Sequence, residues 1–151
     1  GLNDGAAALV LTSRAEAERQ GLTPMARIVG YTLAAVAPKW LFAAPARALP
    51  KLLKRIGWQM EDVDLFELNE AFAAQCLANG AELQQGGYPF SWDNVNVNGG
   101  AIALGHPIGA SGARVLVTLL YGLQNRGLQR GVAALCLGGG EAVALAVEME
   151  G

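Results

Sequence analysis

Charged side chains are scarce in this sequence, and so are the side chains that build metal sites. Only 16% of the residues are charged and 52% are hydrophobic, which argues against a disordered chain and indicates a packed core. The net charge is −2 and no cluster of lysine or arginine occurs, so we expect no nucleic acid partner. No apolar run approaches the roughly 20 residues of a membrane-spanning helix, so we expect no membrane partner.

Cysteine and histidine are rarer still. The chain has two cysteines, Cys76 and Cys136, and one histidine, His106. Two distant cysteines make no disulfide framework and the sequence offers no metal-ligand set, so we expect no metal and a reducing, cytoplasmic location. No signal peptide is visible at the start. Residues 1–5 run at once into strand-like sequence, and we expect that another segment precedes them.

The length and the pattern of apolar residues predict one α/β domain over residues 1–151. A domain of this size buries roughly two-thirds of its unfolded surface. Runs fit for strands lie at residues 6–11, 26–33, 63–68, 132–135 and 142–149, with residues 95–98 extended. Helical patterns lie between Ser13 and Gly21 and at residues 51–56, 70–84 and 110–124. The alternation predicts a three-layer α/β/α fold with a five-stranded mixed sheet, its last two strands forming an antiparallel hairpin.

Two of these segments carry more specific expectations. The helix at residues 110–124 is apolar almost all round, which predicts burial on every side. Pro38, Pro45 and Pro50 predict an irregular stretch before the helix at residues 51–56, with Pro50 near its first turn.

The strongest sign of function is a titratable side chain beside each of two glycine-rich turns. His106 lies in GHPIGASG at residues 105–112, and Cys136 begins CLGGG at residues 136–140. Glycine lets backbone approach a ligand closely and donate N–H bonds to it. Imidazole and thiol groups held in this way serve proton transfer and thiol chemistry, so the sequence indicates an enzyme.

Asn69 and His106 each have a functional and a structural interpretation. Asn69 directly follows the strand at residues 63–68, and ligands gather beyond the carboxyl ends of strands in open α/β sheets. Alternatively, Asn69 only caps the next helix. The helix at residues 110–124 directs its positive end toward the loop of His106, which favours an anionic ligand or a thiolate there. Alternatively, His106 only bonds a backbone carbonyl in a tight loop.

Cys136 ends an apolar strand, where its thiol can act as an acid or, once deprotonated, as a base. The N–H groups of residues 138–140 could stabilise a neighbouring oxyanion. The alternative for Cys136 is a small buried hydrophobe at the end of a strand. Cys76 has no glycine turn beside it, and we interpret it as a core residue.

Three of these segments together resemble the thiolases, the acetyl-CoA acetyltransferases and 3-ketoacyl-CoA thiolases. They are FELNEAF at residues 66–72, NVNGGAIALGHPIGASG at residues 96–112 and CLGGG at residues 136–140, and residues 1–6 also fit. The resemblance implies the carboxyl-terminal half of an enzyme that transfers acyl groups between acyl-CoA and coenzyme A. The nucleophilic cysteine of the family comes from the amino-terminal half and has no counterpart here.

The resemblance also implies roles for individual residues. His106 would deprotonate the missing nucleophile and donate into an oxyanion hole, which Asn69 would complete through a water. Cys136 would move the proton at the substrate α-carbon, and the N–H of Gly138 would join a second oxyanion hole. Ala71 and Phe72 would pack near the pantetheine arm.

The resemblance further implies partners, and it leaves other functions open. The implied partners are acyl-CoA or coenzyme A, an amino-terminal thiolase half and further copies in a dimer or tetramer; no cofactor beyond the thioester substrate is implied. Bulky residues at 38–42 stand where the family lines its acyl pocket, and Glu141 and Ala142 stand where methionine and glycine are more usual. One alternative is an inactive binding or assembly module that pairs with a separate half. Another is a thiolase-like protein that binds acyl groups without turnover.

Overall fold

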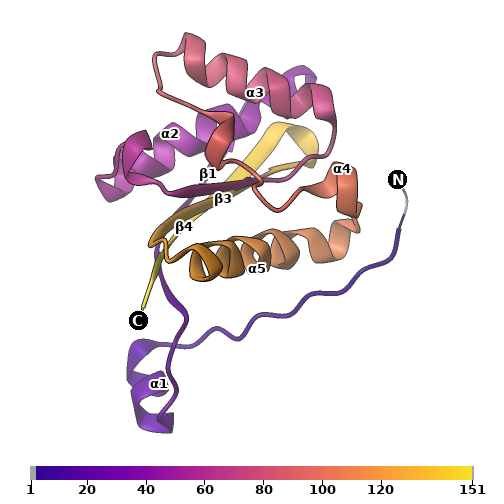
Figure 1. Cartoon of the computed structure of the whole chain (residues 1–151). Coiled ribbons are helices and arrows are strands. Elements are labelled where there is room, and N and C mark those ends of the chain that lie inside the picture. Colours follow the sequence, from indigo (N-terminus) through magenta and orange to yellow (C-terminus); the bar gives the residue numbers. More distant parts are fainter. Residues whose placement is uncertain (1–2, 151) are drawn as a thin grey trace.

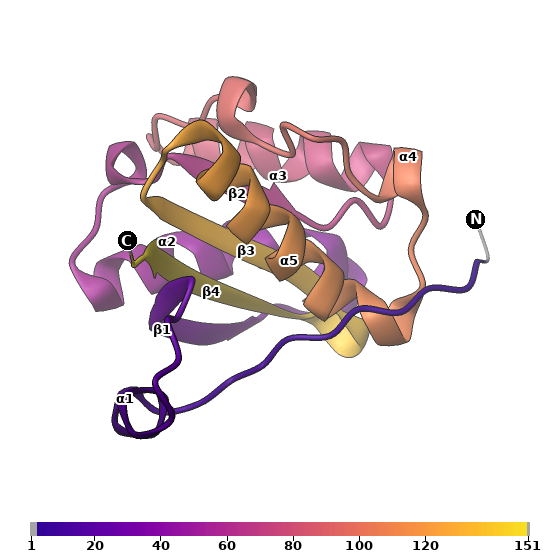
Figure 2. The same cartoon turned by 60° about the horizontal axis from the view of Figure 1, so that its bottom comes forward.

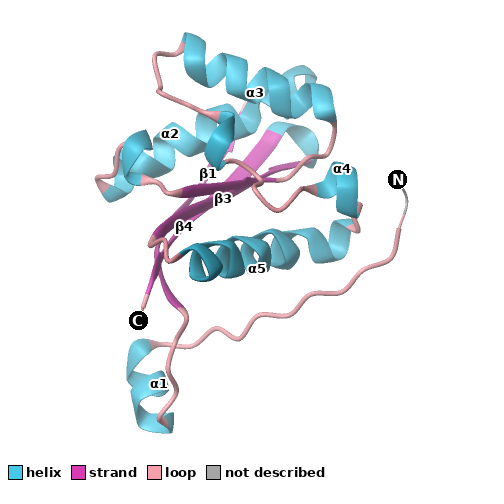
Figure 3. Ribbon diagram, viewed as in Figure 1, coloured by secondary structure: helices cyan, strands magenta, loops and turns pink. Residues whose placement is uncertain are grey.

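The computed structural model describes residues 3–150, so Gly1, Leu2 and Gly151, including the start of the thiolase-like opening segment, lie outside the described residues. The helices are α1 (Arg14–Gln20), α2 (Ala44–Ile56), α3 (Ala73–Gln85), α4 (Ala101–Leu104) and α5 (Ile108–Arg126). The strands are β1 (Ala26–Ala35), β2 (Leu65–Leu68), β3 (Arg130–Leu137) and β4 (Glu141–Met149). Short 3-10 helices are η1 (Pro38–Ala43), η2 (Met60–Asp62), η3 (Trp92–Asn94) and η4 (Gly138–Gly140). Figure 3 distinguishes helices, strands and loops.

The sheet is mixed, as predicted, but it has four strands and not five. Its order is β1-β4-β3-β2; β4 is antiparallel to β1 and to β3, while β2 is parallel to β3. The hairpin of β3 and β4 through η4 confirms the predicted antiparallel pair. Within residues 3–150, no helix has the length and apolar character needed to cross a bilayer.

The predicted strand at residues 6–11 is wrong, and its absence accounts for the count of four. This segment is extended and has no regular secondary structure. It passes outside α5 on the side away from the sheet, as Figure 1 and Figure 2 show. Val10 and Leu11 are 91% and 70% exposed. An apolar run becomes a strand only where a neighbouring strand pairs with its backbone, and this path meets no edge of the described sheet.

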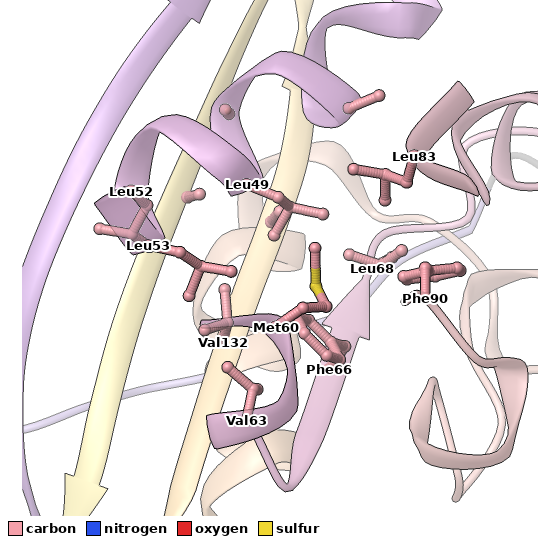
Figure 4. Packing of buried hydrophobic residues seen from close by; sticks show 14 of the residues in the cluster. Leu49, Leu52, Leu53, Met60, Val63, Phe66, Leu68, Leu83, Phe90 and Val132 are labelled. Atoms are coloured by element: carbon pink, nitrogen blue, oxygen red, sulfur yellow. The ribbon is translucent and has the colours of Figure 1, made fainter. Parts of the chain in front are cut away.

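The predicted three layers are confirmed, because α2 and α3 lie on one face of the sheet and α5 lies on the other (Figure 1). Figure 4 shows the first core, where leucines of α2 pack against side chains from β2 and β3. The second core joins α5 to the opposite face through Leu65, Val115, Leu119, Leu123 and Ala133. Each large side chain buried in this way contributes about 1.5–3 kcal/mol.

Alternation along β2 decides which of its side chains meets which helix. Phe66 and Leu68 belong to the core under α2, and Leu65 belongs to the core under α5. Successive side chains of a strand point to opposite faces, so Glu67 shares the α5 face with Leu65. Glu67 is only 3% exposed, which places a carboxylate against a helix packed on the sheet.

The helix boundaries and the burial of α5 also differ from the expectations. α2 begins at Ala44 and continues through Pro45 and Pro50, so the predicted irregular stretch is wrong there. Proline fits the first turn of a helix, and the buried face of α2 offsets the hydrogen bond that Pro50 removes from its interior.

α5 is not buried on every side, since Ile108 is 82% and Tyr121 52% exposed. A helix lying on one face of a sheet packs with one side only.

Candidate active site

The topology brings three of the predicted site residues to one edge of the sheet. β2 and β3 are parallel, so their carboxyl ends meet, and Asn69 follows the one while Cys136 lies near the end of the other. His106 precedes α5, the helix that crosses the same two strands. Ligand sites of open α/β sheets form at this edge.

Asn69 and His106 are in direct contact. Nδ2 of Asn69 lies 3.2 Å from Nε2 of His106, and the Asn69 backbone N–H donates to the carbonyl of Ala134 at 2.9 Å. Asn69 is 1% exposed. The N-cap of α3 is Phe72, which has extended backbone, so α3 starts three residues later than predicted and Asn69 does not cap it. The capping alternative is therefore wrong.

The imidazole of His106 is held at both ring nitrogens. Nδ1 lies 2.6 Å from Oγ of Ser111, whose hydroxyl donates to the carbonyl of Pro107 at 3.0 Å. The backbone N–H of His106 donates to Oδ1 of Asn3 at 2.9 Å. The ring thus contacts two side chains rather than a backbone carbonyl of its own loop, so the carbonyl contact of the structural alternative is wrong, while the functional role of His106 stays a prediction.

The two thiols differ in their surroundings. Cys136 is half-buried, and burial raises the pKa of its thiol above the ordinary value, partly offset by a hydrogen bond from its own backbone N–H. A protonated Cys136 is suited to donate a proton. Cys76 is buried in α3, as predicted, and burial raises its pKa to about 12, with Glu70 and Cys136 adding to the rise.

The glycine turn after β3 is open at Gly138. Gly138 is exposed, and a Cβ built on it would meet nothing within 4 Å. Gly139 and Gly140 have φ angles of +80° and +101°, which favour glycine. A ligand can therefore approach the backbone at Gly138 while its neighbours hold the turn.

Ala71 and Phe72 lie between β2 and α3, where the chain leaves Asn69. Ala71 is half-buried and Phe72 is 60% exposed. The ring of Phe72 packs edge-to-face on Phe42 of η1, with ring centroids 5.2 Å apart. The bulky residues 38–42 therefore border the segment that the resemblance places near the pantetheine arm.

Sequence reasoning missed three residues behind the site. Ser111 holds the ring of His106, and Arg114 of α5 approaches both Glu67 and Asn69. A signal was available, because a carboxylate inside an apolar strand and an arginine inside an apolar helix are uncommon unless they pair.

The prediction of an extended segment at residues 95–98 is correct only for Val95, which forms an isolated bridge with Phe66, because residues 96–98 form a bend and a turn. In this turn Oδ1 of Asn96 accepts from the backbone N–H of Leu68 at 2.8 Å.

The fold and the site define an α/β domain with an imidazole, an amide and a thiol at the carboxyl ends of two parallel strands. The chain belongs to the thiolase family, because the family model for the thiolase C-terminal domain matches residues 22–149.

Named relatives share this region at high identity. The acetyl-CoA acetyltransferase of Chromobacterium violaceum is 56% identical over 148 residues, which cover 98% of this chain and 36% of the relative. The cytosolic acetyl-CoA acetyltransferase of Mus musculus is 54% identical over 148 residues, with the same coverage of 98% and 36%. The chain thus spans about a third of the length of the curated relatives it matches.

Solved structures agree in fold. The crystal structure of the Bacillus anthracis acetyl-CoA acetyltransferase has a TM-score of 0.86 at 49% identity, covering 91% of this chain and 34% of that one. The crystal structure of human mitochondrial 3-ketoacyl-CoA thiolase has a TM-score of 0.86 at 39% identity, with the same coverage of 91% and 34%.

Proposed function

We propose that this chain forms the carboxyl-terminal catalytic part of a thiolase, which transfers acyl groups between acyl-CoA and coenzyme A. The direction is thiolysis of a 3-ketoacyl-CoA or the reverse Claisen condensation, since one set of groups serves both. The observation that carries the proposal is the contact of Asn69 with His106 at the edge where Cys136 lies, in a chain of this family.

In thiolysis, the proposed roles of His106 and Cys136 are proton transfers. Nε2 of His106 takes the proton from a nucleophilic cysteine of the amino-terminal half. The resulting thiolate bonds to the keto carbon of the 3-ketoacyl-CoA, and the bond between that carbon and the α-carbon breaks. The electron pair stays on the α-carbon as an enolate, and the Cys136 thiol donates a proton to it to give acetyl-CoA. The Cys136 thiolate then takes the thiol proton of coenzyme A, whose sulfur displaces the cysteine from the acyl-enzyme and releases the shortened acyl-CoA. Protonated His106 returns its proton to the cysteine thiolate that leaves.

Preorganised donors stabilise the negative charges of this sequence. Protonated His106 and a water bound by Asn69 form one oxyanion hole, and the N–H of Gly138 joins a second. Ala71 and Phe72 contact the pantetheine arm. The proposed assembly contains an amino-terminal thiolase half and further copies in a cytoplasmic dimer or tetramer. The proposed chemistry uses the coenzyme A thioester as substrate and needs no separate cofactor.

A grafting experiment tests the proposal. This chain replaces the matching part of the Chromobacterium violaceum acetyl-CoA acetyltransferase, and thiolysis of acetoacetyl-CoA is followed by its loss of absorbance. We expect an active graft and no activity from the chain alone. His106→Ala or Cys136→Ala should lower kcat by at least ~100-fold. The matched variant Cys76→Ala removes a core thiol and should retain activity within a few-fold.

The alternative of an inactive binding or assembly module predicts the opposite result. A graft that assembles with native size and secondary structure but shows no thiolysis would favour that alternative. Activity from the chain alone would assign a nucleophile to one of its own cysteines and contradict the division of roles above.

A further inference from the structure

A buried ion pair lies directly behind Asn69. Oε2 of Glu67 is 3.6 Å from Nη1 of Arg114, and the two side chains are 3% and 19% exposed. Nη2 of Arg114 reaches Oδ1 of Asn69 at 3.5 Å. Within residues 3–150, neither Oε2 of Glu67 nor Nη1 of Arg114 has a hydrogen-bond partner. Arg114 thus directs its side-chain hydrogen bond to Asn69 rather than to Glu67.

The fold places this pair where it bears on the contact between Asn69 and His106. Glu67 precedes Asn69 by two residues and faces α5 from β2. Arg114 follows Ser111 by three residues in α5, and residues three apart lie on the same face of a helix. One turn of α5 therefore presents Ser111 to the ring of His106 and Arg114 to the amide of Asn69.

Stability gives no reason for an ion pair at this place. Replacing a buried ion pair with apolar side chains of similar volume is often neutral or stabilising. Burial raises the pKa of Glu67 to about 7 although Arg114 opposes the rise, so the pairing does not fully offset the loss of water. Leu65 occupies the equivalent face two residues earlier and packs into the core of α5. A site role accounts for the pair better than packing does.

The donors and acceptors along this chain of contacts can be assigned from the arginine outward. A guanidinium only donates, so the Asn69 atom that faces Arg114 is Oδ1. The amide nitrogen then faces His106, and because an NH₂ group also only donates, Nε2 of His106 accepts. The ring proton of neutral His106 is left on Nδ1, where it donates to Ser111.

We propose that Arg114, held by Glu67, is a positioning residue that fixes the orientation of the Asn69 amide and thereby keeps the lone pair of His106 on Nε2. Without Arg114 the amide can turn its oxygen toward His106, which draws the ring proton to Nε2 and removes the acceptor. The importance of this acceptor for catalysis rests on the proposed function, in which Nε2 takes a proton, but the orientation itself does not.

The single histidine makes a direct test possible. The 151-residue chain is labelled with ¹⁵N-histidine, and the imidazole nitrogens are observed by NMR at about pH 8, above the ordinary pKa of imidazole. We expect the wild-type chain to carry the proton on Nδ1. Arg114→Gln should shift the population toward the tautomer protonated on Nε2. Arg114→Lys retains a donor and should restore the wild-type signals.

Arg126→Gln is the matched control, because it removes the same charge from the same helix at a side chain that contacts Asn98 instead. It should leave both imidazole signals unchanged. A wild-type proton on Nε2, or an Arg114→Gln variant with native amide signals and unchanged imidazole signals, would overturn the proposal. An Arg114→Gln variant that does not fold is replaced by Glu67→Gln, which should also increase the Nε2 tautomer.

Kinetics of the grafted enzyme separate this proposal from the proposed function. Arg114→Gln should lower kcat about 10-fold with little change in KM, as is usual for losing a group that orients a functional residue. An inactive graft whose imidazole signals respond as expected would reject the function and keep the positioning role. An active graft in which Arg114→Gln changes neither kcat nor the imidazole signals would keep the proposed function and reject the positioning role of Arg114.

Discussion

Nδ1 of His106 lies 2.6 Å from Oγ of Ser111, so the first turn of α5 holds the ring of a residue in the loop before the helix. The hydroxyl of Ser111 donates a hydrogen bond to the carbonyl of Pro107 at 3.0 Å. Ser111 is 1% exposed, which keeps water from competing for either bond. The orientation of the imidazole is therefore set by a helix of the core rather than by the loop from which it projects.

Ser111→Ala should weaken both the fold and the site. The substitution leaves the Nδ1–H of His106 without its acceptor, and such a loss costs about 1–3 kcal/mol in the free energy of unfolding. Urea denaturation of the chain measures this loss. In the grafted enzyme we expect kcat to fall roughly 10-fold, because the ring is no longer held. Ser111→Thr keeps the hydroxyl and should recover most of kcat; equal losses in both variants would contradict the role of the hydroxyl.

The pKa of Glu67 predicts how stability depends on pH. Burial raises this pKa from 4.5 to about 7, against the opposing charge of Arg114 and with a further contribution from Glu70. Between these values the native state binds more protons than the unfolded state, so the free energy of unfolding falls as pH rises. The cost is absent below about pH 4.5 and complete above about pH 7, and at about 1.4 kcal/mol per unit it is on the order of 3 kcal/mol.

Urea denaturation at a series of pH values checks this slope in the wild type and in Glu67→Gln. The substitution removes the titrating group, so the difference in stability between the two proteins should change with pH in that window. Glu148 should affect stability with the opposite dependence on pH, because hydrogen bonds from Arg130 and Arg27 lower its pKa. Its contribution is present at neutral pH and lost as the medium becomes acidic. A constant difference between wild type and Glu67→Gln would show that Glu67 does not titrate in this range.

Much of the architecture is predictable because local patterns and tertiary packing agree. The hairpin of β3 and β4 and the helices α1, α3 and α5 all follow from short stretches of sequence. The segment at residues 6–11 fails because a strand depends on a partner strand, which the segment itself does not encode. The predicted start of α2 is wrong because the buried face of a helix can offset an interior proline such as Pro50.

The candidate site is likewise predictable only where a short stretch of sequence carries the signal, and not where it depends on contacts between distant residues. His106, Asn69 and Cys136 were predicted from their turns and strand ends, and the structure brings the first two into contact. Their roles in catalysis stay predictions. Short stretches of sequence do not reveal Arg114 and Glu67, because these two residues lie far apart in sequence and meet only where α5 packs on β2. A charged residue in an apolar segment is the sign that a sequence offers of such a contact.

The two cysteines should differ in reactivity toward an alkylating reagent. Cys136 is half-buried next to the open turn, whereas Cys76 is buried with a pKa raised to about 12. The thiolate is the reactive form, and burial raises the pKa of the Cys136 thiol as well, so the reaction is run at about pH 9. Native protein treated with iodoacetamide should then gain one adduct, on Cys136, because the reagent can reach this half-buried side chain. Mass spectrometry with peptide mapping identifies the site. Cys136→Ala should gain none until urea exposes Cys76; an adduct on Cys76 in native protein would contradict its assignment to the core.

Alanine substitutions at Gly138 and Gly140 should separate strain from function within one turn. Gly140 has a φ of +101°, and a Cβ there would lie 2.5 Å from the carbonyl oxygen of Val36, so Gly140→Ala should destabilise the fold by about 2 kcal/mol or more. A Cβ on Gly138 meets nothing within 4 Å, and Gly138→Ala should change the free energy of unfolding by less than about 1 kcal/mol. Under the proposed function it should nevertheless lower kcat of the grafted enzyme, because the added methyl group obstructs approach to the oxyanion donor. Urea denaturation and thiolysis rates of both variants provide the check, and equal stability losses would show that the turn tolerates no side chain at either position.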